Sequence, residues 1–183
     1  MNKCLIVVDL QNDYFPSGKM QLVGIEDAAE NARILLAEFR KTKLPIVHIQ
    51  HVSILPNAFF FLPDTEGVKI NERITPQEGE AVVLKNYPNS FRGTSLLEML
   101  TNAHVDNLLI CGAMSHMCID ATTRAAFDLG FNCVVAEDAC ATMDLVFRNK
   151  IIKASDVHAS FMAALSFSYA KVVLTRDIVK SRA

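Results

Sequence analysis

Three residues from distant parts of the sequence, Asp9, Lys85 and Cys118, have side chains that together can perform acid–base and nucleophilic chemistry. Asp9 and Lys85 each come at the end of an apolar run, and Cys118 lies in the turn that follows the apolar run 107–113. An aspartate can accept a proton from a thiol and later deliver it to a leaving group. The sequence therefore predicts a cysteine nucleophile with Asp9 as its general base.

The position of Cys118, where a predicted strand turns into a helix predicted over 118–129, favours ionisation of its thiol. A helix N-terminus presents free N–H groups and the positive end of a dipole, and Lys85 would add a positive charge. The turn 112–118 also directs backbone N–H groups at the oxyanion that forms when a thiolate attacks a carbonyl. The other four cysteines are predicted to be structural, since an odd total of five without a C-x-x-C pair is typical of neither disulfides nor structural zinc.

Strand-like and helix-like runs alternate along the chain and must position these residues. Continuous apolar runs predict strands, and apolar residues at helical spacing predict helices. Strands buried on both faces and alternating with helices are typical of a three-layer α/β fold around a parallel sheet. Ligands of such sheets bind outside the carboxyl ends of the strands, so we expect Asp9, Lys85 and Cys118 to meet at one edge. The predicted strands are 3–10, 45–52, 81–85, 107–113, 131–137 and 171–175, and the predicted helices are 25–43, 94–103, 118–129 and 155–170.

Composition excludes several classes of protein. A chain of 183 residues with 51% hydrophobic and 21% charged content predicts a single globular domain over residues 1–183. A net charge of -2 and the lack of a basic run among aromatic residues argue against nucleic acid as a partner. The longest apolar runs fall far short of the roughly 18 residues of a membrane span, and the N-terminus carries no cleavage site. We therefore expect a cytoplasmic protein with no membrane partner.

Three segments resemble the signature segments of the isochorismatase-like cysteine hydrolases. They are VVDLQNDYF (7–15), KNYPNSFRGT (85–94) and GAMSHMCIDATTRAAFDLG (112–130), and their order and spacing span nearly the whole chain. The resemblance implies a Rossmann-like fold with a six-stranded parallel sheet flanked by helices. It also implies an enzyme that hydrolyses a small molecule and forms homo-oligomers, either dimers or larger assemblies.

The same resemblance assigns roles to individual residues. It implies a catalytic triad of Asp9, Lys85 and Cys118, with a thioester at the cysteine that water then hydrolyses. It further implies a cis peptide bond between Ala113 and Met114. The oxyanion hole would then be formed by the backbone N–H groups of Met114 and Cys118.

The nicotinamidase branch of this family holds a metal ion with a D-x-H-P-x-x-H segment after the second strand, and this chain departs from that pattern. The corresponding stretch reads HIQHVSILPNAF, with His51 near the place of the aspartate and Ser53 near that of the first histidine. His48 and His51 lie three apart on a strand, so they point to opposite faces and cannot chelate one ion. We expect no metal and no cofactor.

Four residues are candidates for the substrate pocket. Tyr14 and Phe91 follow Asp9 and Lys85 in the sequence, and His116 lies two residues before Cys118. Phe60 comes from the long irregular stretch 52–77 and, like Phe61, could cover the site as part of a lid, although packing in the core or at a subunit interface is the favoured alternative for this phenylalanine run. Such a pocket suits small, partly apolar amides.

Two other reactions compete with hydrolysis of a C–N bond. A vinyl ether such as that of isochorismate would need acid catalysis by Asp9 rather than a thiol, so retention of activity in Cys118→Ala would identify it. An aspartate at a strand end with a later lysine is also the layout of Asp-nucleophile phosphohydrolases. Those enzymes need a second acid two residues later to hold magnesium, and this chain has Gln11 there.

Overall fold

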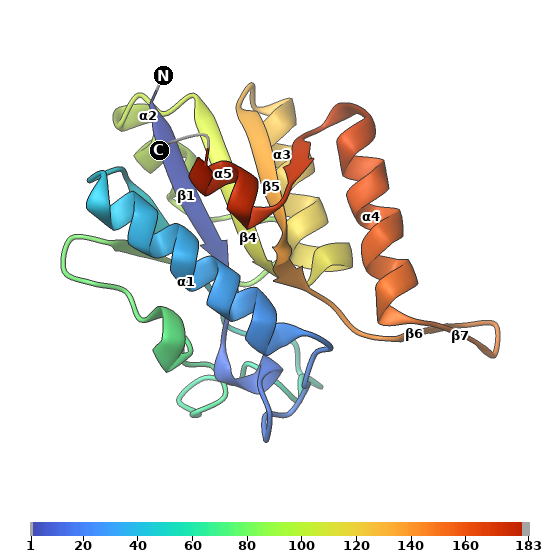
Figure 1. Cartoon of the computed structure of the whole chain (residues 1–183). Helices are drawn as coiled ribbons and strands as arrows, with labels where there is room; N and C mark the ends of the chain where they lie inside the picture. The colour runs from blue at the N-terminus through green and yellow to red at the C-terminus, as the bar shows by residue number, and fades with distance from the viewer. Residues whose placement is uncertain (1, 181–183) are drawn as a thin grey trace.

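Six parallel strands form one sheet in the structure, a computed structural model that describes residues 2–180 (Figure 1). The strand order is β3-β2-β1-β4-β5-β8, and every neighbouring pair is parallel. The predicted six-stranded parallel sheet is therefore confirmed. The strands are β1 (Lys3–Val8), β2 (Ile46–His51), β3 (Ala81–Lys85), β4 (Asn107–Ala113), β5 (Asn132–Ala141) and β8 (Lys171–Val173).

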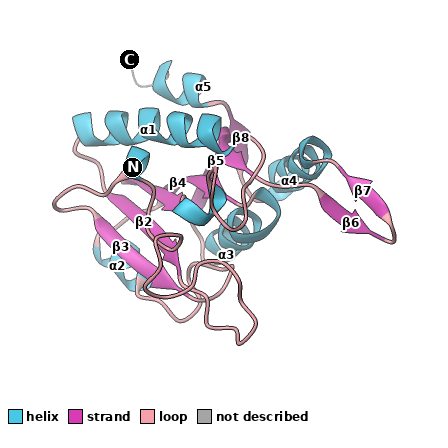
Figure 2. Cartoon of the chain, turned by 90° about the horizontal axis from the view of Figure 1, so that it is seen from below, coloured by secondary structure: helices cyan, strands magenta, loops and turns pink. Residues whose placement is uncertain are grey.

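Helices cover both faces of the sheet, which gives the three layers seen from below in Figure 2. One face carries α1 (Ile25–Lys41) and α5 (Thr175–Lys180), and the other carries α2 (Leu96–Asn102), α3 (Asp120–Asp128) and α4 (Ala154–Ser168). Among residues 2–180 none of these helices has the length and apolar character needed to cross a bilayer.

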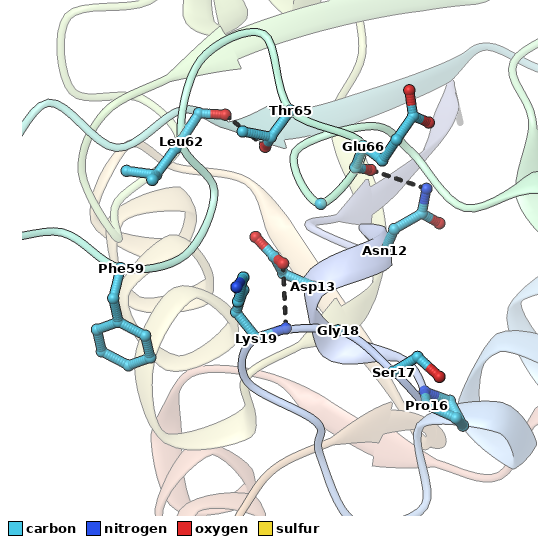
Figure 3. Close-up of a pocket in the computed structure, with 11 residues that line it drawn as sticks. Asn12, Asp13, Pro16, Ser17, Gly18, Lys19, Phe59, Leu62, Thr65 and Glu66 are labelled. Atoms are coloured by element: carbon cyan, nitrogen blue, oxygen red, sulfur yellow. Dashed lines mark hydrogen bonds between the residues drawn. The ribbon is translucent and has the colours of Figure 1, made fainter.

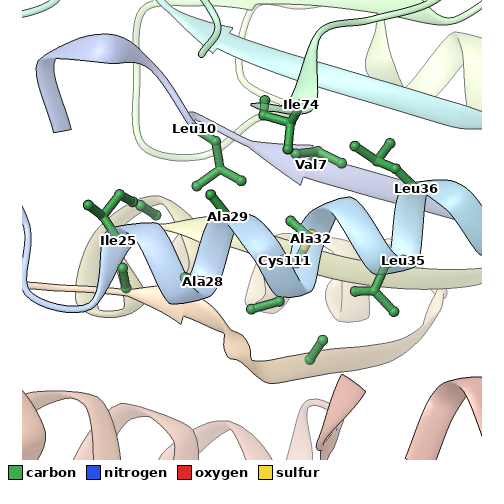
Figure 4. Packing of buried hydrophobic residues seen from close by; sticks show 14 of the residues in the cluster. Val7, Leu10, Ile25, Ala28, Ala29, Ala32, Leu35, Leu36, Ile74 and Cys111 are labelled. Atoms are coloured by element: carbon green, nitrogen blue, oxygen red, sulfur yellow. The ribbon is translucent and has the colours of Figure 1, made fainter. Parts of the chain in front are cut away.

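Alternate residues of β1 divide the core between the two faces. Leu5 and Val7 belong to the cluster under α1, whereas Ile6 and Val8 belong to the cluster under α2 and α3. Small side chains on α1 let the helix lie close to the sheet, as Figure 4 shows for the three alanines 28, 29 and 32. Each leucine that the helix buries contributes about 1.5–3 kcal/mol through removal of apolar surface from water.

A hairpin after β5 was not predicted from the sequence. It consists of β6 (Leu145–Phe147) and β7 (Lys150–Ile152), and it projects away from the three layers in both views (Figures 1 and 2). The two connecting residues, Arg148 and Asn149, both have positive φ, at 48° and 62°. Two-residue hairpin turns of this kind usually carry glycine, so the sequence lacks the usual turn signal.

Candidate active site

The carboxyl ends of β1, β3 and β4 bring Asp9, Lys85 and Cys118 together. Lys85 Nζ lies 2.7 Å from Asp9 Oδ2 and 3.2 Å from Cys118 Sγ. All three residues are buried, with exposed fractions of 0% for Asp9, 1% for Lys85 and 5% for Cys118. The convergence predicted from the strand ends is therefore present in the structure.

Local backbone geometry sets the direction of Asp9. Its φ of 52° lies in the left-handed region, which aspartate tolerates better than most residues. The Asp9 N–H donates to the Ile49 carbonyl of β2, and the Gln11 N–H donates back to the Asp9 carbonyl, at 3.0 and 2.9 Å. Within the described residues no hydrogen-bond donor pairs with Oδ1 of Asp9. One carboxylate oxygen thus faces Lys85 while the other is available for proton transfer.

A close approach of β4 to β1 precedes the cysteine turn. Gly112 has a φ of 127°, and a Cβ at this position would overlap the carbonyl oxygen of Val8. Glycine is the residue that fits both constraints. The peptide bond between Ala113 and Met114, which follows this close approach, is cis, as the resemblance implied.

The turn then continues as a π-helix, η3 (Ser115–Ile119), before α3 begins at Asp120. The carbonyl of Met114 accepts hydrogen bonds from the N–H groups of Met117 and Ile119, at 3.0 and 3.2 Å. These bonds wrap the backbone around the end of β4 and carry Cys118 to Lys85. The predicted helix over 118–129 therefore starts two residues later than expected, and Cys118 lies in the π-helix.

Burial and charge keep the cysteine protonated in the resting site. Burial raises the pKa of the Cys118 thiol, the negative charge of Asp9 raises it further, and Lys85 opposes both. Burial tends to lower the pKa of Lys85, but the charge of Asp9 and the hydrogen bonds to Asp9 and Cys118 outweigh this and raise it, so the amine is an ammonium. The prediction that the position of Cys118 favours a thiolate is therefore wrong for the resting state, because the sequence did not reveal the burial.

His51, at the end of β2, is a fourth member of this cluster. Its Nδ1 atom lies 2.9 Å from Lys85 Nζ, and the two residues are paired in register across β2 and β3. Burial lowers the pKa of His51 to about 4, and the charge of Lys85 adds to this effect. From the sequence, His51 was weighed only as a possible metal ligand. Its pairing opposite Lys85 in the neighbouring strand is the feature that would have indicated its contact with Lys85.

Asp9, His51 and Cys118 are the one group within residues 2–180 with the side chains and spacing to hold a metal ion. Each offers one ligand atom, and these atoms lie within 4.8 Å of one another. However, the Lys85 ammonium lies 2.7–3.2 Å from all three side chains and occupies the position between them. A divalent cation would be repelled by this charge, so the donor set does not fit a metal while Lys85 is present. Absence of a metal stays a prediction.

Aromatic side chains stand beside the cluster. The Tyr14 ring packs 4.6 Å from Phe61 and 6.0 Å from Phe60, and the Phe61 ring lies 5.8 Å from His51. Burial raises the pKa of Tyr14, and the nearby charge of Asp9 adds to the rise. The structure thus brings Tyr14 to the triad and places Phe60 next to it.

Asp13 fastens the phenylalanine segment to the end of β1. Its Oδ2 accepts from the Phe61 N–H at 2.6 Å and its Oδ1 accepts from the Lys19 N–H at 3.1 Å. The two loops enclose a cavity of about 420 Å³, lined by residues such as Asn12, Phe59 and Leu62 (Figure 3). No triad residue lines this cavity.

The structure places Phe91 away from the triad and His116 beside Thr142, which follows β5. Phe91 stacks on Phe131, which lies at the amino end of β5, with ring centroids 6.1 Å apart, so the structure does not bring it to the triad. The loop after Lys85 turns back under the sheet, which adjacency in the sequence did not reveal. The His116 Nδ1 atom pairs with Thr142 Oγ1 at 2.6 Å, and its ring meets Phe161 of α4 edge-on. A contact of His116 with substrate stays a prediction.

Comparisons with known proteins agree with this geometry. Residues 3–168 match the model of the isochorismatase domain. The isochorismatase family protein YddQ of Bacillus subtilis is 50% identical over 180 residues, which cover 98% of this chain and 100% of that protein. Streptothricin hydrolase of Streptomyces noursei is 33% identical over 176 residues, covering 96% and 60%. The crystal structure of an isochorismatase hydrolase from Oleispira antarctica has a TM-score of 0.94 at 50% identity, covering 98% of this chain and 96% of that one.

Proposed function

The chain belongs to the isochorismatase family of hydrolases, and within this family we propose that it cleaves the amide-type C–N bond of a small molecule through a thioester at Cys118. The observation that carries the proposal is the buried Lys85 ammonium, which lies within hydrogen-bond distance of a carboxylate and of a cysteine sulfur. The match to streptothricin hydrolase supports hydrolysis of a small molecule.

The first half of the reaction forms the thioester. When the substrate carbonyl reaches Cys118, Asp9 takes the thiol proton and Sγ bonds to the carbonyl carbon. The carbonyl electron pair moves to oxygen, which the N–H groups of Met114 and Cys118 stabilise as an oxyanion. The C–N bond then breaks, the nitrogen takes the proton from Asp9, and ammonia or an amine leaves.

The second half releases the acid. Water gives a proton to Asp9 and its oxygen bonds to the thioester carbon. The C–S bond breaks, the sulfur recovers the proton from Asp9, and a carboxylic acid departs. Lys85 lowers the free energy of each state in which negative charge is present on Asp9 or Cys118, since it contacts both.

The substrate that fits is uncharged and partly apolar. The charges of Asp9 and Lys85 cancel, and His51 is neutral at physiological pH because its pKa is about 4. The rings of Tyr14, Phe60 and Phe61 pack together as an apolar group beside the cluster. We therefore propose a small neutral amide as the substrate class.

The position of Gln11 argues against the phosphohydrolase alternative. Its amide nitrogen donates to the carbonyls of His51 and Val68, at 2.8 and 2.7 Å, and its amide oxygen accepts from the His51 N–H at 2.8 Å. The amide oxygen is thus already engaged by backbone, although a magnesium-dependent site would need an acid at this position. Gln11 instead fixes the end of β2 to the end of β1.

A panel of small neutral amides, assayed for ammonia release with wild-type protein and the Cys118→Ala variant, tests the proposal. We expect at least one amide to be hydrolysed by the wild type and not by the variant. A thioester should also be trapped by hydroxylamine as the hydroxamate during turnover. Full activity of Cys118→Ala would refute the thioester and support vinyl ether hydrolysis by Asp9.

We further propose that the protein is a cytoplasmic homo-oligomer. Val146, Phe147 and Ile151 of the projecting hairpin are 73%, 63% and 60% exposed. A two-stranded hairpin is marginally stable alone in water, so a covering surface from a second copy would stabilise it. All five cysteines are free thiols, which is typical of a reducing compartment. Sedimentation of the wild type and of a Val146→Asp, Phe147→Asp double variant tests the assembly, and an unchanged mass would refute the role of the hairpin.

A further inference from the structure

The Lys85 ammonium has three acceptors arranged around it. Its Nζ atom lies 2.7 Å from Asp9 Oδ2, 2.9 Å from His51 Nδ1 and 3.2 Å from Cys118 Sγ. An ammonium group carries three N–H donors and no acceptor, so each donor has one partner in this site. Two partners belong to the proposed triad, and the third is a histidine to which the mechanism assigns no step.

The contact with Lys85 determines the protonation of His51. An ammonium can only donate, so Nδ1 must carry a lone pair and the imidazole proton must be on Nε2. A charged imidazolium would place two cations 2.9 Å apart, which burial makes more costly. Burial and Lys85 lower the pKa of His51 to about 4, whereas the charge of Asp9 acts in the opposite direction.

The protein fixes His51 from several sides. Gln11 bonds to both the N–H and the carbonyl of His51, which holds the backbone in place. The ring lies 5.8 Å from that of Phe61, whose N–H is held by the buried Asp13 carboxylate. Side chains from the segment after β1 and from the segment after β2 thus contribute to the orientation of one imidazole.

We propose that His51 is a positioning residue, a neutral Nε2-protonated imidazole whose Nδ1 accepts the third ammonium proton and thereby holds Lys85 on Asp9 and Cys118. This inference deepens the proposed function and rests on it. The held ammonium serves as the permanent cation of the site, in the space between Asp9, His51 and Cys118 that a metal ion would otherwise need. Without an acceptor at position 51, the ammonium has one free donor and two partners left, Asp9 and Cys118.

The direct test is nitrogen NMR of the substrate-free wild-type protein. At neutral pH we expect His51 to show an unprotonated Nδ1 and a protonated Nε2, and the Lys85→Met variant to lose this preference. His48 on the same strand, which pairs with Glu80 through Nε2, is the internal comparison. A protonated Nδ1 of His51 in the wild type would overturn the proposal. Since no substrate is used, this result is independent of the proposed reaction.

Variants at position 51 test the consequence for chemistry. His51→Gln keeps a side-chain oxygen that can accept from Lys85, whereas His51→Leu has a similar volume and no acceptor. We expect kcat/KM to fall about 10- to 100-fold in His51→Leu, as for other small misplacements of a catalytic group, and to recover most of this loss in His51→Gln. The loss should be in kcat rather than in KM.

Iodoacetamide labelling of Cys118 supplies a second readout in the same variants. The curve of labelling against pH should move to higher pH in His51→Leu, because a less well held Lys85 stabilises the thiolate less. It should stay near the wild-type curve in His51→Gln and in His48→Gln, a control that removes a buried histidine on the opposite face of β2. Equal behaviour of the leucine and glutamine variants in both assays would overturn the proposal.

Discussion

The Asp9→Asn variant separates two effects of Asp9 on Cys118, its negative charge and its capacity to take a proton. The ligand atoms of the two residues lie within 4.8 Å of each other. At an effective dielectric constant of about 20, two unit negative charges at this separation repel by about 3.5 kcal/mol. Removal of the charge therefore lowers the pKa of Cys118, since Lys85 still stabilises the thiolate and the carboxylate no longer opposes it.

The two effects predict opposite changes in two measurements. A short pulse of iodoacetamide across the neutral to alkaline range, followed by mass spectrometry, should label Cys118 of Asp9→Asn at lower pH than in the wild type. Turnover should fall by about 10²–10⁴-fold, because asparagine cannot act as a general base. Burial raises the pKa of Cys4 and Cys133 to about 12, so both serve as unchanged internal controls. Labelling that moves to higher pH, or turnover that persists, would refute the reasoning.

Other perturbations have equally defined outcomes. Lys85→Met removes the group that lowers the pKa of Cys118, so labelling should move to higher pH and turnover should fall about 100-fold or more; unchanged labelling would contradict this. Gly112→Ala places a Cβ on the Val8 carbonyl, so chemical denaturation should show a loss of about 2–4 kcal/mol, and wild-type stability would refute the close approach. Burial would raise the pKa of Glu80, but Arg40 outweighs it and lowers the value to about 2. The stability from Glu80 is therefore full above about pH 4.5 and is lost as the pH falls toward 2, so the destabilisation of Glu80→Gln, about 1–3 kcal/mol at neutral pH, should vanish in acid. Activity should survive treatment with a chelator, and its loss with recovery on addition of zinc would contradict the prediction of no metal.

The sheet and helices α1 to α4 were predictable because their signals are local, whereas α5 was not predicted. The strands of the main sheet contain short apolar runs, and α1 carries its buried residues at helical spacing. Hairpin β6–β7 was missed because its strands have three residues each and its turn uses Arg148 and Asn149 in place of glycine. A pattern of apolar residues does not reveal an element stabilised by so few contacts within its own chain.

The triad was predictable for a different reason. A general rule about the carboxyl ends of parallel strands places Asp9, Lys85 and Cys118 at one edge, whatever the details of packing. His51 was missed as a partner of Lys85 because its role depends on the register between β2 and β3 and on the contact with Gln11, which lies 40 residues away in sequence. Proton positions depend on burial in the same way, so the thiolate was predicted in error for Cys118.

The buried pair of Asp9 and Lys85 is better explained by chemistry than by stability. Both side chains have no exposed surface, and taking two charges out of water costs several kcal/mol per ion, which a pair recovers only when its remaining donors and acceptors are satisfied. Here Oδ1 of Asp9 has no hydrogen-bond donor within the described residues, so the cost is not fully offset. A fold selected only for stability would gain from uncharged residues at both positions. The unsatisfied oxygen is the one that our mechanism uses to take the proton of Cys118, and we therefore expect the double variant Asp9→Asn, Lys85→Leu, in which asparagine tolerates the left-handed φ of position 9, to be inactive while unfolding at a temperature no lower than that of either single variant.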